Sequence, residues 1–392
     1  MNSNMILLED RLGLSFRSSE RMRSLYTCQG YHFFDIVFET WNALQTQAPA
    51  VAFGPVPIGG VTKFCLMMRQ LLLHNAGKTI VACSNRLAPE DVTTAALLIG
   101  SFMILCRGKR AQDVEEVFQD LSVHFICFAD PNSLERSCIL SVQDAWEALE
   151  KARHEGWIDL NRGITPGTDA LYLGSFDQWE SEHYARKSNG NVRMVIPGKM
   201  IIFPRPVDLP DGRRWQDDTE RGRLFSPHFY ADLFKDEMDV SVVLCLNDST
   251  SSDYDRTIFE DQEIEVDEMH VEGHYGLLSA MSRFLDIAKA APGHVAIHTS
   301  SEGNGGGTLG TFAVSYLINR LGFRPKAAVA WVRMVYAELL VPLDAAPALE
   351  VEGFVRLKSL TEAHAANHNV SNEVPAYPSL SRSFSLPNLR QL

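Results

Sequence analysis

The segment from Gly293 to Gly322 constrains the fold of this chain most strongly, because a short apolar strand, a glycine-rich turn and an apolar helix follow one another there. Residues 294–297 come after Pro292-Gly293 and are typical of a buried strand. A turn with four glycines comes next, and Thr308 is expected to cap a helix that ends at Gly322. Free backbone N–H groups and the helix dipole converge at such a turn, so the segment predicts an anion-binding loop. The loop would consist of Ser300, Ser301, Gly303, Gly305, Gly306, Gly307 and Thr308.

Several phosphate-binding folds share this layout, and the residue types decide between them. A nucleotide-binding P-loop needs a Gly-Lys-Ser/Thr ending, and no lysine occurs between Pro292 and Arg320. The stretch instead resembles the signature loop of cysteine-dependent phosphatases, which reads His-Cys, five residues, Arg, then Thr-Gly. Without gaps, His298 matches the histidine, whereas Thr299 replaces the nucleophilic cysteine and Gly305 replaces the arginine. No cysteine elsewhere in the chain is followed six positions later by an arginine.

Length and composition fit a soluble protein of two domains. The 392 residues are enough for two ordinary cores, and 45% hydrophobic with 22% charged residues is typical of globular chains. No uncharged apolar run reaches the roughly eighteen residues that span a bilayer, and the acidic pair Glu9-Asp10 comes too early for a secretory signal. A formal net charge of -13 argues against binding to nucleic acid or to anionic membranes. The default compartment is the cytoplasm.

The metal-binding residue types form no convincing site. Seven cysteines are scattered without a CxxC pair or metal-like spacing, which predicts reduced core thiols. His270 and His274 flank Glu272, but this spacing alone is typical of solvated histidines. Neither a metal nor a cofactor is therefore expected.

The rest of the chain alternates between strands and helices, as in an α/β fold. The predicted strands are 78–83, 195–203, 240–246 and the region of Ile264 and Val266, and the predicted helices are 93–105, 113–121, 142–154 after an N-cap at Ser141, 275–290 and 325–335. A weak internal repeat is visible, since strand 80–83 and helix 93–105 echo strand 295–298 and helix 308–321, with a loop between strand and helix in each case. The repeat predicts two related units.

In their order and spacing, these elements resemble the cell division cycle 14 family of dual-specificity phosphatases along residues 5–345. The similar segments are Leu97-Leu-Ile-Gly100, Val195-Ile-Pro-Gly-Lys-Met200, Val242-Val-Leu-Cys-Leu-Asn247, Arg283-Phe-Leu-Asp-Ile287, His298, Thr308-Leu309 and Ala330-Trp-Val-Arg333. The resemblance implies an α/β fold with two tandem dual-specificity-phosphatase-like domains, each a central sheet flanked by helices, of which only the second is catalytic in the family. We expect an N-terminal domain without catalytic residues over 1–165, a linker over 166–190, a C-terminal domain over 191–358, and a flexible or docking tail over 359–392.

The departures from the family pattern indicate an inactive protein. The family's chemistry needs a thiolate of lowered pKa and an arginine that grips the phosphate with two hydrogen bonds, and Thr299 and Gly305 stand at these positions. By the resemblance, the general-acid aspartate corresponds to Glu272, and segment 336–344 retains none of the polar residues that the family carries there. The positions His298, Thr299, Gly305 and Glu272 are therefore interpreted as degenerate. The alternative is an active dual-specificity protein tyrosine/serine phosphatase with unorthodox catalytic residues.

A phosphatase-like protein without catalysis is expected to act as a structural scaffold or protein-binding module. Nine acidic residues lie within 253–272 against one arginine, which indicates either a solvated edge strand or an acidic face for a basic partner. Members of the resembled family often act at spindle poles, centrosomes and basal bodies, so cytoskeletal, axonemal or ciliary proteins are the candidate partners. The tail 359–392 is polar but carries spaced apolar residues, which is typical of either a disordered or a docking segment.

Overall fold

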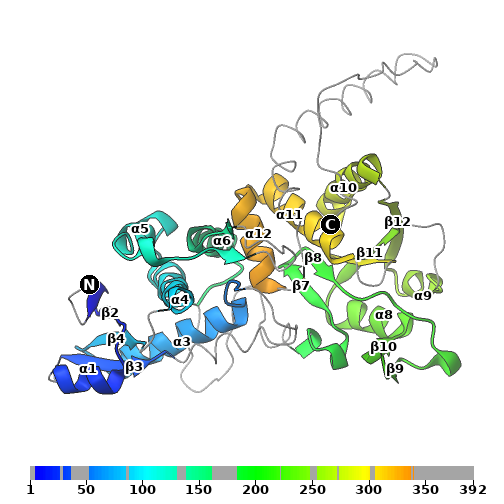
Figure 1. Cartoon of the computed structure of the whole chain (residues 1–392). Coiled ribbons are helices and arrows are strands. Elements are labelled where there is room, and N and C mark those ends of the chain that lie inside the picture. The colour runs from blue at the N-terminus through cyan, green and yellow to red at the C-terminus, as the bar shows by residue number, and fades with distance from the viewer. Residues whose placement is uncertain are drawn as a thin grey trace, which may run out of the picture.

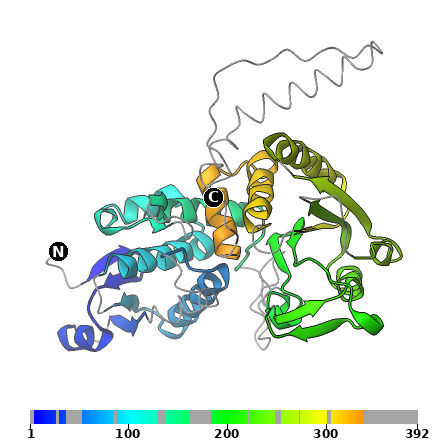
Figure 2. The same cartoon turned by 45° about the vertical axis from the view of Figure 1, so that its right-hand side comes forward.

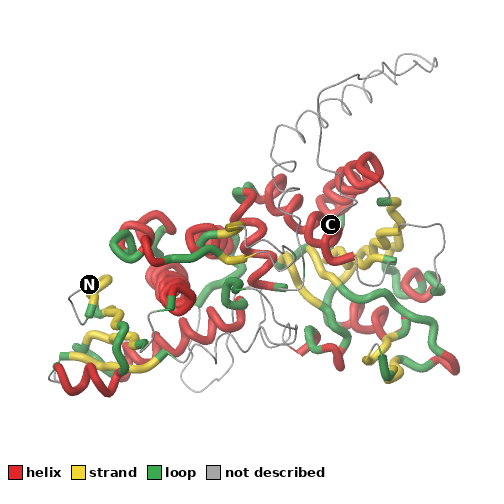
Figure 3. The backbone as a smooth tube through the Cα atoms, viewed as in Figure 1, coloured by secondary structure: helices red, strands yellow, loops and turns green. Residues whose placement is uncertain are grey.

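Two separate main sheets organise the chain, and each takes all of its strands from one half of the sequence. The structure, a computed structural model, describes residues 5–26, 30–36, 53–84, 88–129, 138–160, 183–220, 222–247, 254–271, 273–300, 305–336 and 339. Figure 1 shows the first sheet with its helices in blue and cyan and the second in green and yellow, and helix α12 lies where the two halves meet. The turned view in Figure 2 keeps the halves side by side. Both sheets mix parallel and antiparallel pairs and are flanked by helices, so the fold is α/β (Figure 3).

The first half is a four-stranded sheet between two helical layers. In spatial order its strands are β1 (Ile6–Glu9), β2 (Leu12–Ser15), β4 (Thr79–Cys83) and β3 (Tyr31–Asp35). Its helices are α1 (Ser19–Leu25), α3 (Ile58–His74), α4 (Pro89–Arg107), α5 (Ala111–Val117) and α6 (Val142–His154), with a small ladder of β5 (Phe128–Ala129) and β6 (Cys138–Leu140) and a 3-10 turn η2 (Ser122–His124). β1 and β2 form an antiparallel hairpin, whereas β2, β4 and β3 run parallel. Alternate residues of β4 face α1 on one side and α3 with α4 on the other.

The second half is a five-stranded sheet in which only one edge strand is antiparallel. In spatial order its strands are β12 (Glu265–His270), β11 (Val240–Asn247), β13 (His294–Thr299), β8 (Met200–Ile202) and β7 (Arg193–Ile196). The helices are α8 (Pro227–Asp236), α9 (Thr257–Glu260), α10 (Gly273–Ala290), α11 (Gly305–Leu321) and α12 (Pro325–Val335), with a hairpin of β9 (Trp215–Asp218) and β10 (Gly222–Phe225) and 3-10 turns η3 (Lys187–Asn189) and η4 (Pro210–Gly212). Helices α8 and α9 pack on one face of this sheet, and α10, α11 and α12 pack on the other.

The two halves share one hydrophobic core along a seam between α6 and α12. Trp157, which follows α6, stacks on Phe323 with ring centroids 5.7 Å apart and touches Trp331 of α12 with centroids 4.9 Å apart. Trp331 is fully buried, and its indole N–H donates to the carbonyl of Val195 over 2.9 Å. An ion pair between Arg324 and the first half adds a polar contact at the rim. One continuous cluster of buried side chains therefore runs from the first sheet to the second.

The sequence predicted several elements to the residue. Helix α12 spans 325–335 and helix α6 spans 142–154, as expected, and the hydroxyl of Ser141 accepts the Asp144 amide in a capping box. The strands at 78–83 and 240–246 are confirmed as β4 and β11 with one end of each differing by one residue, and the acid-rich strand near Ile264 is confirmed as β12 at the sheet edge. Gly322 ends α11 in the left-handed region that glycine tolerates, with φ of +68°.

Other expectations were wrong in detail. Helix α11 begins at Gly305, three residues before Thr308, so Thr308 lies inside the helix and does not cap it. The strand predicted over 195–203 is an antiparallel pair, β7 and β8, because the Pro197-Gly198 turn reverses the chain. Cys127 is disulfide-bonded, whereas all seven cysteines were expected to be reduced.

Helix α4 is longer than predicted, and its composition resembles that of a membrane-spanning helix. It spans Pro89–Arg107 instead of 93–105, and α5 spans Ala111–Val117 instead of 113–121. Among the described residues, α4 is the one helix that is long and apolar enough to cross a membrane. However, 83% of the 18-residue stretch that meets this test is buried inside the protein. Burial on all sides identifies α4 as a core helix, which is why its sequence shows no polar face.

The internal repeat corresponds to a shared geometry. In both halves a strand with parallel neighbours on both sides leads through five residues into a long buried helix, namely β4 into α4 and β13 into α11. The division into tandem domains at 1–165 and 191–358 stays a prediction. Residues 166–182 of the proposed linker and the whole tail 359–392 lie outside the described residues.

Candidate functional site

The predicted signature loop starts at the carboxyl end of β13, in the middle of the second sheet. Ligands in open α/β sheets bind at this edge, because strand ends and helix N-termini meet there. Of the predicted positions, the structure places His298 and Thr299 at the end of β13, Ser300 directly after it, and Gly305 at the start of α11. Gly306, Gly307 and Thr308 continue the first turns of that helix, whereas Ser301, Gly303 and Glu272 lie outside the described residues.

The His298 ring is held by contacts on both of its nitrogens. Its Nδ1 lies 3.4 Å from the carbonyl oxygen of Thr299, which can only accept, so Nδ1 carries the proton. Its Nε2 lies 2.8 Å from the hydroxyl of Tyr254, which therefore donates. The Phe203 ring packs edge-on against the imidazole at 5.0 Å. Both nitrogens of the neutral imidazole are thus engaged inside the protein.

The protonation of His298 follows from its surroundings. The side chain is fully buried, and burial lowers its pKa to about 4, while the Thr299 carbonyl partly opposes this and Arg205 and Arg256 lower it further. Burial likewise raises the pKa of Tyr254 well above its usual range. At neutral pH the pair is therefore an uncharged hydrogen-bonded couple.

Ser300 is tied to the neighbouring strand and to Arg205. Its amide donates to the carbonyl of Leu246 over 3.0 Å, which extends the parallel ladder by one residue beyond β13. Its own carbonyl accepts a hydrogen bond of 3.2 Å from the guanidinium of Arg205. These bonds fix where the chain leaves the sheet and enters the loop.

A second polar chain lies beside His298 on β11 and β12. Cys245 lies opposite His298 on the neighbouring strand β11. Its thiol donates a hydrogen bond of 2.8 Å to the side-chain oxygen of Asn247. The Asn247 amide donates to Glu268 over 3.0 Å, and Arg256 forms an ion pair with the same carboxylate. Burial, with the Glu268 carboxylate adding to it, raises the pKa of the Cys245 thiol to about 12. The thiol nearest to His298 in the sheet is therefore protonated and unreactive at neutral pH.

Sequence reasoning missed the residues that support the loop. Tyr254, Arg205 and Asn247 lie 44, 93 and 51 residues before His298, and only the fold brings them together. Arg256 had a visible signal, since it is the one cation in the acidic run 253–272. It forms an ion pair with Glu268.

The acidic run is more neutralised than its sequence suggests. Asp267 pairs with Arg283 over 2.8 Å, and Glu263 pairs with Lys235 over 2.9 Å. Glu265 on the edge strand β12 is exposed. Among the described residues, no group of three or more histidine, cysteine, aspartate or glutamate side chains is arranged to hold a metal ion.

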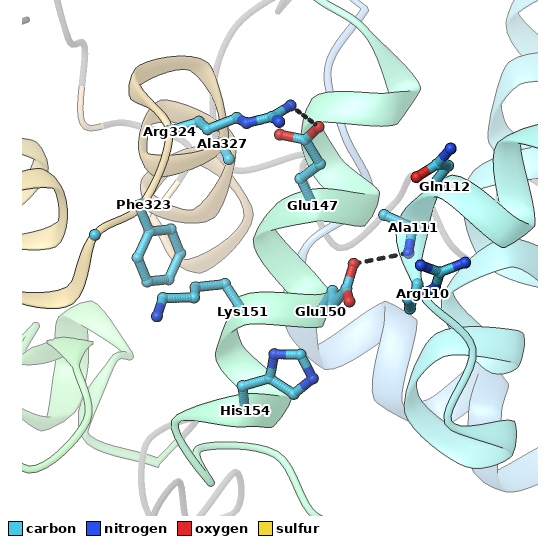
Figure 4. A pocket seen from close by; sticks show the side chains of 11 residues that line it. Arg110, Ala111, Gln112, Glu147, Glu150, Lys151, His154, Phe323, Arg324 and Ala327 are labelled. Atoms are coloured by element: carbon cyan, nitrogen blue, oxygen red, sulfur yellow. Dashed lines mark hydrogen bonds and ion pairs between the residues drawn. The ribbon is translucent and has the colours of Figure 1, made fainter.

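A cavity of about 340 Å3 opens at the seam between α6, the start of α5 and the turn from α11 to α12 (Figure 4). Arg324 forms an ion pair with Glu147 over 2.6 Å, and Glu150 accepts a hydrogen bond of 2.7 Å from the amide of Ala111. Figure 4 marks both contacts with dashed lines. Burial raises the pKa of Glu147, and Arg324 opposes that shift. These charged groups are bonded to protein partners, and the cavity shares no residue with the loop at 298–305. It marks where the two halves pack together.

One described family matches part of the first half of the chain. Residues 7–152 match the family described as "Dual specificity protein phosphatase, N-terminal half". The match covers the first sheet and its helices, the half that contains no predicted catalytic residue.

Among individual proteins, the chain is homologous to CDC14 phosphatases at about 24% identity. It is 24% identical over 356 residues to "Dual specificity protein phosphatase CDC14C" of Symphalangus syndactylus, which covers 85% of this chain and 64% of the relative. It is 24% identical over 327 residues to the human protein of the same name, covering 79% and 63%. The match to "Tyrosine-protein phosphatase cdc-14" of Caenorhabditis elegans is 25% over 292 residues and covers 72% and 37%. The chain thus spans less than two thirds of the length of these relatives.

Solved structures give a weaker likeness. "Crystal Structure of PTPMT1" is 13% identical, with a TM-score of 0.29, and covers 45% of this chain and 99% of that one. "Crystal structure of Tk-PTP in the active form" is 17% identical, with a TM-score of 0.27, and covers 44% and 96%. Scores this low carry no argument about the fold or the chemistry.

Proposed function

We propose that this chain is a catalytically inactive relative of the dual-specificity phosphatases and acts as a structural scaffold or protein-binding module. One observation carries the proposal. Thr299 stands at the end of β13 where the related enzymes' signature pattern has its cysteine, and the adjacent His298 is neutral, with both ring nitrogens already hydrogen-bonded.

A threonine at this position needs a base before it can act as a nucleophile. Cysteine phosphatases use a thiolate, whereas a threonine hydroxyl stays protonated near neutral pH unless a base removes its proton. The lone pair of His298 accepts the Tyr254 hydroxyl, so it is not directed at Thr299. Loss of a nucleophile alone costs roughly a millionfold in turnover in a serine protease. A replacement from Cys245 is disfavoured, because its pKa of about 12 keeps the thiol protonated.

The missing arginine removes the second requirement of the reaction. Gly305 begins α11 where the signature arginine belongs, so no guanidinium rises from that position to hold the phosphate and stabilise transition-state charge. The nearest arginines bond to protein groups, Arg205 to the Ser300 carbonyl and Arg256 to Glu268. The loop residues Ser300 to Thr308 are proposed to bind an anion but not to hydrolyse an ester.

A scaffold role agrees with the packing of the halves. The shared core between α6 and α12 makes the proposed tandem domains a single platform instead of two mobile modules. The partners are proposed to be proteins, with basic, cytoskeletal or axonemal proteins as the candidates. The proposed location is the cytoplasm, at the cytoskeleton or the cilium.

Hydrolysis of p-nitrophenyl phosphate separates this proposal from the alternative of an active dual-specificity phosphatase. The purified chain and its Thr299→Ala variant should both give only the background rate of a heat-denatured sample. Thr299→Cys should also stay at background, because Gly305 still supplies no guanidinium. Turnover that disappears in Thr299→Ala, or in Cys245→Ser, would establish the active alternative.

The scaffold half of the proposal needs its own test. Tagged full-length chain and a version ending at residue 358 should be compared for the proteins that co-purify with each from the same cells. We expect a defined set of partners with the full chain and weaker recovery without the tail. Equal recovery would remove the tail from the account, and recovery of no specific partner would remove the scaffold role.

A further inference from the structure

The hairpin of β9 and β10 has one edge without a neighbouring strand. Among the described strands β9 pairs only with β10, in an antiparallel register that places Trp215 opposite Phe225. The hairpin is anchored through β10, because Phe225 packs on Phe229 of α8 with ring centroids 4.5 Å apart. Figure 1 shows β10 between α8 and β9. An edge strand of this kind can accept a further strand through its backbone.

The hydrogen bonds of the ladder indicate which backbone groups of β9 are left for a further strand. The Ser226 amide donates to the carbonyl of Arg214 over 2.9 Å, and this pair continues the register of the ladder. Hydrogen-bonded residues alternate along an antiparallel pair, so Gln216 also directs its backbone groups toward β10. Trp215 and Asp217 direct theirs outward, where no described strand pairs with them.

The side chains on this edge are held in place although they are exposed. Trp215 is 47% exposed, and the guanidinium of Arg223 lies 3.9 Å from the centre of its ring. Arg223 also donates two hydrogen bonds to the carboxylate of Asp217, over 2.7 and 3.1 Å. A side chain that is already ordered loses little entropy on binding, and tryptophan and arginine are enriched at the centres of protein interfaces.

The charges along β9 favour a second copy of the chain as the partner. Two exposed arginines, Arg213 and Arg214, precede Trp215, and the strand ends with the acids Asp217 and Asp218. When two such strands align antiparallel, the basic start of each lies against the acidic end of the other. Opposite charges across neighbouring strands stabilise the pair, and like charges destabilise it. The strand is therefore complementary to itself in charge.

We propose that β9 pairs antiparallel with β9 of a second copy of this chain, which joins the two hairpins into one four-stranded sheet. The two-fold axis passes between the two copies of Gln216. The outward groups of Trp215 exchange hydrogen bonds with those of Asp217 in the other copy, and Arg214 lies opposite Asp218 of the other copy. Each of these contacts occurs twice, as a symmetric dimer requires.

Contacts within the chain are compatible with this pairing. Arg214 forms an ion pair with Asp232 of its own chain, and its side chain is still 63% exposed. Asp218 accepts the amide of Glu220 and is half-buried. The acid-rich edge strand β12 differs from β9, because antiparallel pairing with its own copy would place acids opposite acids at its centre.

The dimer is expected to be weak and sensitive to salt. Two strands of four residues bury less surface than the roughly 1,600 Å2 of a standard protein interface, so we expect a dissociation constant in the micromolar range. Its ion pairs are exposed, and salt screens such pairs. The pairing goes beyond the proposed scaffold role and does not depend on it, because neither catalysis nor partner binding by a single chain requires β9 to be paired.

Sedimentation velocity of the full chain across the micromolar range tests the dimer. We expect a shift from monomer to dimer as the concentration rises. Arg214→Asp and Asp218→Arg should each raise the dissociation constant about tenfold or more, because like charges then meet at both ends of the paired strands. A mixture of the two variants should form dimers with about the affinity of the unmodified chain, since every facing pair again has opposite charges.

The mixture also controls for folding, because a misfolded variant would not recover on mixing. The melting temperature of each variant, measured in dilute solution, provides a second check. A chain that stays monomeric across the range would overturn the proposal and leave β9 as an edge for a different protein. A dimer that neither variant weakens, or that the mixture does not restore, would also overturn it, because its interface would lie elsewhere.

A cross-link tests the register. The two Gln216 Cα atoms at the axis form a pair without mutual hydrogen bonds, in which about 4.5 Å separates them, within the range of a disulfide. Gln216→Cys should therefore give a covalent dimer on mild oxidation that reduction separates. Thr219→Cys is the matched control, because its two copies would lie about 20 Å apart. The unmodified chain gives the background from native cysteines, and a Gln216→Cys chain that cross-links no more than this background would contradict the proposed pairing.

Discussion

The two strand–loop–helix units of this protein have the same frame, which is a strand with parallel neighbours followed by a buried helix. They differ in the residues around the loop between strand and helix. In the first unit, β4 runs into α4, and in the second, β13 runs into α11, each through five residues. Both strands have parallel neighbours on either side, and both helices contribute buried side chains to the shared core. The frame is therefore determined by packing, which the two units have in common.

The difference lies in the residues around the loop. The first strand ends at Cys83, whose thiol is buried and whose pKa is raised to about 12, and the first turn of α4 carries Glu90 and Asp91. These carboxylates occupy the positions that the helix dipole favours for an anion. The second strand ends at Thr299, and α11 begins with glycines and without an acid. By the proposal, the second unit keeps this frame but lacks the thiolate and the guanidinium of the signature pattern, with Thr299 and Gly305 at their positions.

The largest expected effect comes from the seam that joins the two units. Trp331→Ala removes a fully buried indole, its contact with Trp157 and its hydrogen bond to Val195, which should lower the free energy of unfolding by about 3–5 kcal/mol. Because both units share this core, we expect one cooperative transition in urea that shifts as a whole. Trp215→Ala on the exposed β9–β10 hairpin is the control and should change stability little. Separate transitions for the two halves would show that the comparison concerns independent domains.

The next effect distinguishes the units by their pH dependence. His298 has its pKa lowered to about 4 by burial, whereas its counterpart one residue before the end of β4 is Ala82, which has no proton to gain. As pH falls from about 6.5, the unfolded chain binds a proton that folded His298 accepts only near pH 4, so the free energy of unfolding should fall by about 3 kcal/mol over that range. Above pH 6.5 this contribution is constant.

Urea unfolding between pH 4 and 7 measures this effect. In the variant His298→Gln, the free energy of unfolding should change less with pH than in the unmodified chain. The comparison uses only this slope, so the absolute stability of the variant does not matter. Replacement of the exposed His183 by glutamine serves as the control and should leave the slope unchanged. The same slope in all three proteins would mean that His298 is not the buried titrating group.

A smaller effect concerns the start of β13, the strand of the second unit. A Cβ on Gly293 would lie 2.1 Å from the carbonyl oxygen of Asp239, a backbone atom that cannot turn aside. Gly293→Ala should therefore cost about 1–3 kcal/mol and displace the start of β13. Gly30→Ala in the first half is the control, since the space around Gly30 is open. Equal stability of the two variants would show that the β11–β13 contact is looser than the structure indicates.

Much of the fold could be predicted from the sequence, because local signals were strong. Ser141 as an N-cap indicated the start of α6, and Pro325 indicated the start of α12. The pairing of strands was less accessible, since Pro197-Gly198 signals a turn within 195–203 but does not say which strands pair on either side of it. The seam between α6 and α12 is formed by residues that lie 170 or more positions apart in the sequence. Hydrophobic periodicity gives no information about contacts at that separation.

The position of the site could be predicted from the sequence, but the residues that surround it could not. The glycine-rich turn after a buried strand located His298 and Thr299, and the structure places them in the last two positions of β13, although the strand was predicted to end at Ile297. The hydrogen bonds that fix His298 come from Tyr254 and from a neighbouring carbonyl, and no spacing rule links a tyrosine 44 residues upstream to a histidine. The start of α11 was misplaced because a run of glycines weakens the usual capping signal.

One measurement addresses the central claim, that the second unit keeps the frame without the chemistry. The chain in molar excess is mixed with a radiolabelled phosphotyrosyl peptide, and samples are quenched over hours to detect a single release of phosphate or a labelled protein. We predict neither free phosphate nor covalent label, with identical traces for the unmodified chain and for Thr299→Ala. Release of phosphate that is lost on Thr299→Ala would contradict the account, because it would make the threonine at the end of β13 a working nucleophile.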